Sequence, residues 1–371
     1  MPRPHRPGGS ATFEAPPNIA LVKYWGVRDA ERVLPYNSSL SVTLGRFRSR
    51  TRVRFDPALD GDRVVLNGAP ATGGPRAAVV RMLDRVRTAA GQALCAEVTS
   101  ENNFPTASGL ASSASGFAAL AGAASAAAGL RLSPRELSRL ARQGSGSAAR
   151  SIYGGFVLWR AGRRPDGRDS YARPLFGEDH WPALADLVVL VANAPVKTVR
   201  SAEAMQATVR TSPEYPQRLA RLPRRIRRIV RALADRDAAR LFPLIMEECD
   251  DFRRVCETTR PPLDYLTATS RAVLAEVRSL NRAAGRPVAA YTHDAGAHVH
   301  VFVLVRDLPA VRRRLRAVPG VTALQVVRPG PGARRLDAGA PTGRRRRPKR
   351  PRPTGRAGRS RPAAGRGRPP R

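Results

Sequence analysis

The positions of apolar and polar residues along the chain predict a mixture of strands and helices. Alternation of the two kinds is the pattern of a strand with one buried face, and an unbroken apolar run predicts a strand buried on both faces. These patterns predict strands over residues 38–44, 50–55, 186–192, 289–292 and 298–305. Apolar residues three and four positions apart predict helices over residues 76–90, 216–234, 238–256, 267–284 and 308–318. We therefore expect an α+β protein without repeats, in two parts that divide near residue 185.

The start of one more helix can be placed from its capping residues. Ser133 is followed by Pro134 and then by Glu136. This is the order of an N-cap hydroxyl, a proline in the first turn and the acid of a capping box. We expect this helix to run to about Gln143.

Charge is concentrated at the carboxyl end. The chain of 371 residues has a net charge of +36, and from Arg334 onward 15 Lys and Arg residues face a single acid. With almost nothing apolar to bury, residues 333–371 are expected to be a disordered basic tail, and residues 1–10 a disordered start. The tail can bind nucleic acid through phosphate contacts, but it has no aromatic residue that would stack on bases. Residues 11–185 and 186–332 remain as two folded domains.

The three cysteines, Cys95, Cys249 and Cys256, are odd in number and lack the spacing of a metal site. They fit free thiols in a reducing compartment, the cytoplasm. Residues 1–10 contain no apolar core region, so we expect no secretory signal there. The uncharged run over residues 102–130 is too rich in Ala, Gly and Ser to predict a membrane span.

Lysine is rare in this chain. Of 65 Lys and Arg residues, only Lys23, Lys197 and Lys349 are lysines. A chain that uses arginine wherever an exposed charge suffices is expected to keep lysine where a compact ammonium is required. Chance is the alternative for any single lysine, and the residues around Lys23 weigh against it.

Residues 103–116 form a loop of small residues that leads into an alanine-rich helix. Without large side chains, the backbone N–H groups of such a loop can approach phosphate oxygens, and the helix N-terminus adds partial positive charge. Ser112, Ser113 and Ser115 supply hydroxyls at a spacing that can reach a phosphate or Mg²⁺. A small-residue helix packed in a core explains the same composition, so this segment alone leaves both interpretations open.

Two further segments carry candidate chemistry. Residues 141–151 hold a Gly-Ser-Gly-Ser turn that presents amides and hydroxyls to an anion. Arg150 follows the turn, and its planar fork suits a carboxylate or a phosphate, although one more surface arginine is the alternative. Residues 291–298 place Asp294 between a strand and a glycine turn, where an Asp also serves as a turn former or helix cap.

Histidines cluster around the same acid. His293, Asp294, His298 and His300 could be drawn as a metal site. Consecutive strand positions and a turn seldom converge on one ion, so we expect no transition metal here.

Together these segments resemble the diphosphomevalonate decarboxylases of the galactokinase, homoserine kinase, mevalonate kinase and phosphomevalonate kinase superfamily. The similarity extends in order over residues 13–332, outside the basic tail. The blocks that carry it are residues 18–26, 34–41, 103–116, 141–151, 205–208, 211–213, 291–298 and 329–332. Each block alone is a modest match, and the ordered set is highly specific.

The resemblance implies a two-domain fold like that of this kinase superfamily. It has an N-terminal domain with a left-handed βαβ unit, a ferredoxin-like C-terminal domain and an active site in the cleft between them. It also implies that ATP with Mg²⁺ phosphorylates the 3-hydroxyl of mevalonate 5-diphosphate, after which phosphate and CO₂ leave to give isopentenyl diphosphate in the mevalonate pathway. A cytoplasmic homodimer that acts on this small molecule is implied as well.

The resemblance also assigns roles by motif position. It implies that Asp294 takes the proton of the 3-hydroxyl, that Lys23 keeps Asp294 ionised, and that Arg150 clamps the substrate carboxylate. The other residues expected to bind the substrate are Asn18, Tyr24, Ser145, Gly146 and Ser147. The residues expected to bind ATP are Pro105, Ser108, Gly109, Leu110, Ala111, Ser112, Ser113 and Ser115. Mg²⁺ is expected mainly on the ATP phosphates, with Ser113 as its candidate protein contact.

One departure from the family pattern concerns the substrate. Val27 stands where the family has a lysine that contacts the diphosphate, and an apolar residue there resembles relatives that decarboxylate mevalonate 5-phosphate to isopentenyl phosphate. Trp25 and residues 37–41 favour the diphosphate enzymes, and Arg28 is a candidate replacement for the missing charge. We therefore expect the diphosphate as substrate.

Other departures and alternatives remain open at this point. His293, Ala297 and His298 replace a Phe, a Pro and an Asn of the family pattern, and the sequence does not explain them. A mevalonate-type kinase without decarboxylation would keep the ATP loop. A nucleic-acid-binding protein would use the basic surface.

Overall fold

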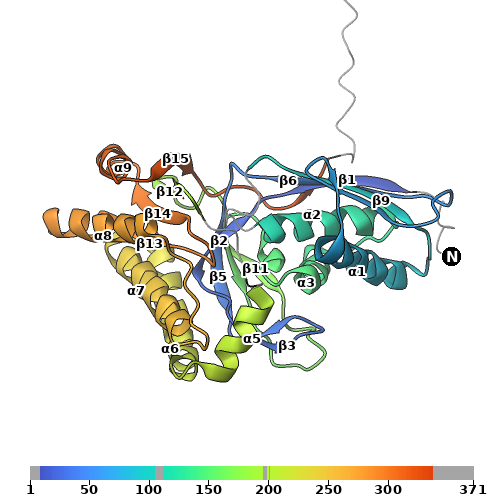
Figure 1. The fold of residues 1–371 in the computed structure, drawn as a ribbon, viewed down its shortest axis with the longest axis horizontal. Coiled ribbons are helices and arrows are strands. Elements are labelled where there is room, and N and C mark those ends of the chain that lie inside the picture. Colours follow the sequence, from blue (N-terminus) through green and yellow to red (C-terminus); the bar gives the residue numbers. More distant parts are fainter. Residues whose placement is uncertain (1–8, 105–111, 195–198, 200, 337–371) are drawn as a thin grey trace, which may run out of the picture. The chain divides into compact units, whose positions relative to one another are not determined.

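The computed structural model describes residues 9–104, 112–194, 199 and 201–336. Its strands are β1 (Ser10–Ala15), β2 (Asn18–Val22), β3 (Val27–Asp29), β4 (Leu34–Pro35), β5 (Ser39–Thr43), β6 (Ser49–Phe55), β7 (Arg63–Leu66), β8 (Ala69–Pro70), β9 (Ala96–Asn102), β10 (Phe156–Trp159), β11 (Ala172–Phe176), β12 (Leu184–Val191), β13 (Ala289–Thr292), β14 (Val299–Leu304), β15 (Val321–Val327) and β16 (Arg334–Arg335). Its helices are α1 (Gly73–Ala90), α2 (Ser112–Ala127), α3 (Pro134–Gly144), α4 (Ala148–Ser151), α5 (Ser201–Thr211), α6 (Glu214–Ala234), α7 (Ala238–Glu257), α8 (Ala268–Ala283) and α9 (Leu308–Arg316). Every strand and helix expected from the apolar pattern is present, with ends that differ by a few residues (Figure 1).

The start of α3 has the predicted capping box. The Ser133 hydroxyl accepts a hydrogen bond from the Glu136 backbone N–H at 3.3 Å, and the Glu136 carboxylate accepts from the Ser133 backbone N–H at 2.8 Å. Pro134 occupies the first turn, where a backbone N–H has no partner within the helix, so the proline loses no helical hydrogen bond. Three local residues are therefore enough to fix where this helix begins.

The first half of the chain is built on a six-stranded sheet in the order β16-β1-β6-β9-β7-β8. Strands β7 and β9 pair in parallel and α1 connects them, which makes a βαβ unit. Helix α2 packs against β1 and β6 of this sheet and against α1, α3 and α4. Its many alanines allow such close packing on several sides. The core-helix explanation of this segment therefore holds for the body of α2.

A second sheet, in the order β11-β10-β5-β2, places the first motif of the chain. Strand β2 is buried along its whole length and pairs with β5. The motif lysine, Lys23, follows directly after the last residue of β2. The strand thus delivers Lys23 into the interior of the protein.

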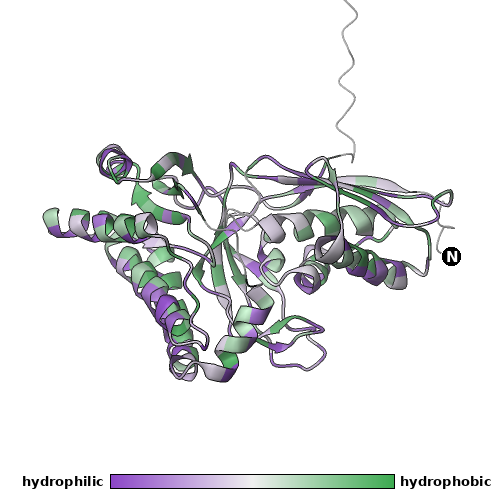
Figure 2. Cartoon of the chain, viewed as in Figure 1, coloured by the Kyte–Doolittle hydropathy of each residue, from purple (hydrophilic) through white to green (hydrophobic). Residues whose placement is uncertain are grey.

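The second half forms a ferredoxin-like unit. Its sheet has the order β13-β14-β12-β15, and each neighbouring pair is antiparallel. In sequence the elements follow as strand, helices, two strands, helix and strand, which is the βαββαβ pattern. Figure 2 shows apolar and polar stretches on α6, α7 and α8, as expected for helices with one face on a core.

One hydrophobic core crosses the expected division near residue 185. It joins Ile19 and Leu40 of the first half to Leu222, Phe242 and Phe302 of the second. The two halves therefore share buried surface, and the domain boundaries at this point stay a prediction.

The last described residues, 333–336, correct the expected start of the tail. Arg334 and Arg335 form β16, which pairs with β1, and the backbone N–H of Leu336 donates to the Thr12 carbonyl at 2.9 Å. Ala333 also packs against the core of the first half. Composition alone could not show this, because strand pairing uses backbone groups that an arginine supplies as well as any other residue.

Two further expectations concern the cysteines and the membrane. The structure describes all three cysteines, and none of them forms a disulfide. Within the part of the chain that is described, no helix is both long and apolar enough to cross a membrane. Of the uncharged run that was weighed as a membrane span, residues 112–127 form α2 in the core.

Candidate active site

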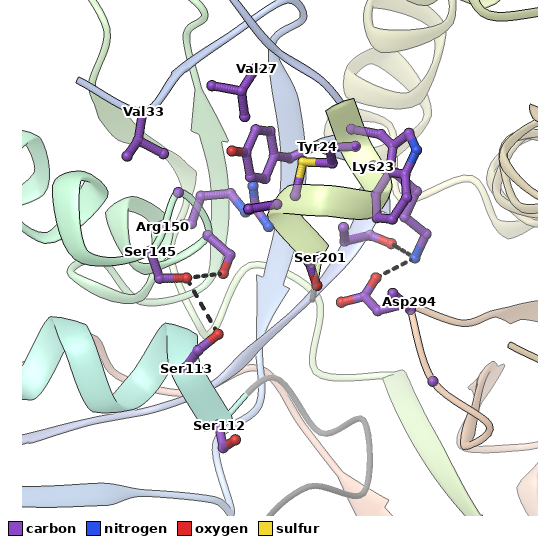
Figure 3. A pocket seen from close by; sticks show the side chains of 18 of the residues that line it. Lys23, Tyr24, Val27, Val33, Ser112, Ser113, Ser145, Arg150, Ser201 and Asp294 are labelled. Carbon is purple, nitrogen blue, oxygen red and sulfur yellow. Dashed lines mark hydrogen bonds and ion pairs between the residues drawn. The ribbon is translucent and has the colours of Figure 1, made fainter. Parts of the chain in front are cut away.

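A cavity of about 540 Å³ lies between elements of the two halves. The first half contributes the residues after β2, the start of α2 and the turn between α3 and α4, and the second half contributes the start of α5 and the loop after β13. The predicted site residues that line it are Lys23, Tyr24, Ser112, Ser113, Ser145, Gly146, Ser147, Arg150 and Asp294. Segments from four distant parts of the sequence thus meet in one pocket (Figure 3).

Lys23 and Asp294 form a buried ion pair at one wall of the pocket. The Lys23 Nζ lies 2.8 Å from Asp294 Oδ1 and donates a second hydrogen bond to the Ala20 carbonyl at 2.7 Å. Lys23 is 2% exposed, whereas a quarter of the Asp294 side chain remains accessible from the pocket. An ammonium with two acceptors fits this small space, and a guanidinium is larger and planar. Lys23, one of the few lysines of the chain, therefore occupies a position that suits an ammonium better than a guanidinium.

The charge of Asp294 is set by two opposing effects. Burial, the largest single effect, raises the pKa of its carboxyl, and the Lys23 ammonium lowers it through its charge and its hydrogen bond. Arg150 and His300 add to the lowering. The net result is an Asp294 pKa below its ordinary value, so this carboxylate is ionised at neutral pH.

Arg150 lies on the other side of the pocket and is held by polar neighbours. Its Nε donates to Asn18 Oδ1 at 3.1 Å, and its Nη1 donates to the Ser39 hydroxyl at 2.6 Å. Burial lowers the pKa of Arg150 to about 10, while the charge of Asp294 opposes the shift. The guanidinium remains charged at neutral pH, in an orientation fixed from behind.

Small residues and an aromatic ring shape the pocket between these charges. The Tyr24 ring packs edge to face on Trp159 with centroids 4.7 Å apart, and burial raises the pKa of its hydroxyl, which therefore stays protonated. A Cβ on Gly146 would lie 2.6 Å from a carbon of the Tyr24 ring, so only glycine fits at this point. The Ser145 hydroxyl lies 3.3 Å from the hydroxyls of both Ser113 and Ser147.

Several predicted residues lie elsewhere. Asn18 is buried behind Arg150, where it donates to the Ser147 carbonyl and the Ser151 hydroxyl, so it orients the site without lining the pocket. Ser115 is fully buried and its hydroxyl lies 2.6 Å from that of Ser49. In this structure Ser115 does not line the pocket as the ATP assignment expects, because the two positions that separate it from Ser113 turn its side chain to the opposite face of α2, towards the sheet.

The remaining predicted ATP contacts cannot be placed. Pro105, Ser108, Gly109, Leu110 and Ala111 fall outside the described residues.

Arg28 does not supply the charge that Val27 lacks. Its Nη2 donates to the carbonyls of Gly162 and Arg164, each at 3.4 Å, and it does not line the pocket. Val27 itself does line the pocket. The expected replacement of the missing lysine by Arg28 is therefore wrong in this structure, since the side chain turns towards another loop.

The three histidines near Asp294 have separate partners. His293 donates from Nδ1 to the Asp294 carbonyl at 2.8 Å, and His298 Nδ1 accepts from the Val191 N–H at 3.2 Å. His300 Nδ1 lies 2.6 Å from a carboxylate oxygen of Asp186. Among the described residues, no group of three His, Cys, Asp or Glu side chains is arranged to hold a metal ion.

We expect His293 to make the stability of the fold depend on pH. Burial, with a smaller contribution from Lys23, lowers its pKa to about 4, whereas an unfolded histidine titrates near 6.5. As pH falls below about 6.5, protons bind the unfolded chain first, and the free energy of unfolding drops by about 2–3 kcal/mol by pH 4.5. Chemical denaturation at pH 7 and pH 4.5 should show this loss, and it should be smaller in His293→Phe. Equal losses in the two proteins would contradict the assignment.

Sequence reasoning missed part of the lining. Ser201, Gln206 and Phe252 line the pocket from helices of the second half, and only Gln206 stood in a block that carried the resemblance. Val33 also lines the pocket and has φ = 51°, a left-handed conformation that β-branched residues rarely adopt. Together with Val27, Val33 gives one side of the pocket an apolar surface.

A buried lysine–carboxylate pair, a clamped arginine and a row of hydroxyls at a helix N-terminus define an enzyme site for a small anionic molecule. Comparison with known proteins shows to which enzyme family the chain belongs. Residues 15–172 match the diphosphomevalonate decarboxylase-like N-terminal domain, and residues 187–328 match the mevalonate 5-diphosphate decarboxylase C-terminal domain. The chain belongs to the diphosphomevalonate decarboxylase family.

Individual relatives agree with this assignment. The diphosphomevalonate decarboxylase of Aspergillus fumigatus is 43% identical over 84% of this chain and 80% of its own length, and that of Homo sapiens is 40% identical over 81% and 78%. The crystal structure of mevalonate diphosphate decarboxylase from Staphylococcus aureus superposes with a TM-score of 0.83 at 36% identity, covering 89% of this chain and 98% of that one. A structure described as MDDEF in complex with MVAPP, AMPPCP and magnesium gives 0.82 at 38% identity, covering 89% and 99%. The family and the two-domain α+β fold inferred from the motifs are thereby confirmed.

Proposed function

We propose that this chain catalyses the ATP-dependent decarboxylation of mevalonate 5-diphosphate, with Asp294, Lys23 and Arg150 as its reacting and binding groups. The products are isopentenyl diphosphate, ADP, phosphate and CO₂. The observation that carries the role assignment is the Lys23–Asp294 pair, which faces the same pocket as Arg150. The mevalonate diphosphate decarboxylase from Enterococcus faecalis is 37% identical to this chain, with a TM-score of 0.81. In that enzyme, mevalonate diphosphate mediates the binding of ATP.

Asp294 acts on the 3-hydroxyl of the substrate. Its accessible, ionised carboxylate accepts the hydroxyl proton as the oxygen attacks the γ-phosphorus of ATP, and ADP leaves. A positioned carboxylate of low pKa is sufficient, because the proton moves while the new O–P bond forms. Lys23 keeps the carboxylate ionised before the step and balances negative charge during it.

Arg150 acts on the substrate carboxylate. Phosphorylation turns the tertiary hydroxyl into a good leaving group, and the C–O bond then breaks with loss of phosphate. Positive charge builds at that carbon, the C–C bond to the carboxylate breaks, and its electron pair forms the double bond as CO₂ leaves. A guanidinium fixed by Asn18 and Ser39 holds the carboxylate in line for this fragmentation.

The serines suit a nucleotide phosphate and its metal ion. Ser112 and Ser113 lie in the first turn of α2, whose N-terminus favours anions, and Ser113 meets Ser145 across the pocket. Hydroxyl oxygens are hard ligands of the kind that Mg²⁺ accepts, and Asp294 is already paired with Lys23. Mg²⁺ would therefore rest mainly on the ATP phosphates with Ser113 beside it, and it neutralises phosphate charge when bound.

The apolar side of the pocket bears on the choice of substrate. Among the described residues that line the pocket, Lys23 and Arg150 are the cations, and Val27 contributes none. This observation keeps mevalonate 5-phosphate as the alternative substrate.

Restoring a charge at this position should strengthen diphosphate binding. We expect Val27→Lys to lower the KM for mevalonate 5-diphosphate by about tenfold or more, since a hydrogen bond to a charged group contributes about 1.5–3 kcal/mol. The KM for ATP should stay within about twofold. Val27→Met, which adds length without charge, is the control and should leave both values near wild type. An unchanged KM in Val27→Lys would show that this wall does not contact the diphosphate.

The proposed substrate is tested by steady-state kinetics on the purified protein with ATP and Mg²⁺. Mevalonate 5-diphosphate and mevalonate 5-phosphate are compared in parallel, and the isopentenyl product is measured. We expect the higher kcat/KM on the diphosphate. A preference for the monophosphate would assign the chain to the alternative reaction. The homodimeric state and the cytoplasmic location implied by the resemblance stay predictions.

A further inference from the structure

A buried carboxylate on α7 holds the backbone of Lys23. Glu248 is fully buried, and its Oε1 accepts a hydrogen bond from the Lys23 backbone N–H at 3.0 Å. The same oxygen accepts from Arg218 Nη2, and Oε2 accepts from Arg225 Nη1 at 2.7 Å. Glu248 does not line the pocket, and its hydrogen bond to Lys23 connects it to a residue that does.

The contact lies at a place where the strand ladder no longer supports the chain. Lys23 is one residue beyond β2, so its N–H is outside the pairing of β2 with β5. Its carbonyl accepts from Asn37 Nδ2 at 2.9 Å. Glu248 and Asn37 therefore fix the peptide groups on either side of the Lys23 Cα.

The second half of the chain holds Lys23 at two points. Glu248 on α7 binds its backbone, and Asp294 after β13 binds its ammonium. Helix α7 packs directly on β13, so the two carboxylates are carried by elements in contact. The position of Lys23 relative to Asp294 is thus set by one packed unit.

The charges around Glu248 are incompletely satisfied, which argues against stability as their main role. Arg218 is fully buried, and within the described residues its Nε and Nη1 have no hydrogen-bond partner. Asp251 completes the cluster by accepting from Arg225 Nη1 and Arg221 Nη2, each at 2.6 Å. Buried ion clusters of this kind often contribute less stability than apolar packing would. A positioning role accounts for such a cluster where stability does not.

We propose that Glu248 is a positioning residue that fixes Lys23 in the orientation required by Asp294. This inference rests on the proposed roles of Lys23 and Asp294. A carboxylate is required because its two oxygens accept three donors, two of them from cations. The NH2 group of a glutamine cannot accept a hydrogen bond, so Glu248→Gln would leave at least one of these donors without an acceptor. The side chain would then hold the Lys23 peptide less firmly.

The test compares Glu248→Gln with Asp251→Asn, which perturbs the same cluster without touching Lys23. We expect Glu248→Gln to lower kcat about tenfold and to leave the KM for ATP within about twofold. The acid limb of the kcat–pH profile should move to higher pH, since a displaced ammonium lowers the pKa of Asp294 less. Asp251→Asn should lose thermal stability to a similar extent but keep kcat within about threefold.

A second variant covers the possibility of a large structural effect. Glu248→Ala removes every acceptor and should lower kcat about a hundredfold, and if it does not fold, Glu248→Gln still decides the question. Wild-type kcat and pH profile in Glu248→Gln would overturn the inference, as would an equal loss of kcat in Asp251→Asn. Lys23→Met and Asp294→Asn are measured alongside. If those two are active, the proposed roles fail; if they are inactive while Glu248→Gln is unaffected, only this inference fails.

Discussion

Asp294→Asn is expected to lower kcat by at least about a hundredfold while ATP binding remains nearly intact. The amide keeps the shape of the side chain but cannot accept the 3-hydroxyl proton as a carboxylate does. It also leaves the Lys23 ammonium, which is 2% exposed, without its counter-charge. ATP is expected on the serines of α2 and on the preceding loop, so its affinity should not depend on Asp294. Single-turnover kinetics with ATP titration separates the two effects.

The matched control for this change is Asp264→Asn. Asp264 is exposed, pairs with Arg271 and does not line the pocket. Its substitution should leave kcat within about twofold. Near wild-type turnover in Asp294→Asn would refute the role of this residue as the base. A loss of ATP binding equal to the loss of turnover would show that Asp294 supports the pocket without acting in the reaction.

Lys23→Arg is expected to lower kcat by at least about tenfold although it keeps the positive charge. The lysine Nζ fits between Asp294 Oδ1 and the Ala20 carbonyl at 2.8 and 2.7 Å, and the lysine is almost fully buried there. A guanidinium needs more room and spreads its donors in a plane, so it would displace the carboxylate it should pair with. Arg28→Lys is the control, because Arg28 lies nearby with its head group outside the pocket. Wild-type turnover in Lys23→Arg would remove the argument from lysine scarcity.

Lys23→Met tests whether the Lys23 ammonium lowers the pKa of Asp294. In the wild type, the Lys23 ammonium lowers the pKa of Asp294 despite burial, so the base stays ionised to below its ordinary titration range. Activity that requires the ionised base is lost as pH falls through this pKa. Without the ammonium, burial remains and raises the pKa, and the acid limb of residual kcat should move to higher pH. An unmoved limb would mean that another group titrates there.

Local signals in the sequence were sufficient for parts of the fold. The capping box of Ser133 and Glu136 needs only neighbouring residues, and α3 begins where it predicts. The alternation of residues 49–55 reports the pleat of one strand in the same way. Such features depend on contacts within a few positions, which a sequence displays directly.

Features that depend on distant contacts were not accessible. The rotation of Ser115 towards Ser49 depends on where the sheet lies relative to α2. The turn of Arg28 towards Gly162 depends on a loop that is 134 residues away in sequence. Glu248 reaches the Lys23 backbone across 225 residues, and nothing near either residue in the sequence indicates it.

Lys23, Arg150 and Asp294 are far apart in the sequence, yet the structure brings all three to one pocket. Each of the three stands in a motif whose neighbouring residues restrict its surroundings. The resemblance then supplied the knowledge that these motifs meet. The resemblance could not show whether another cation replaces the lysine missing at Val27. That depends on which side chains surround Val27 in the folded protein.

The most direct test of the account is the ratio of CO₂ to ADP released by the purified protein with ATP, Mg²⁺ and mevalonate 5-diphosphate. Coupled phosphorylation and fragmentation predict one CO₂ for each ADP, and no CO₂ without ATP. Release of ADP without CO₂ would contradict the account and make the protein a kinase that stops at the phosphorylated intermediate.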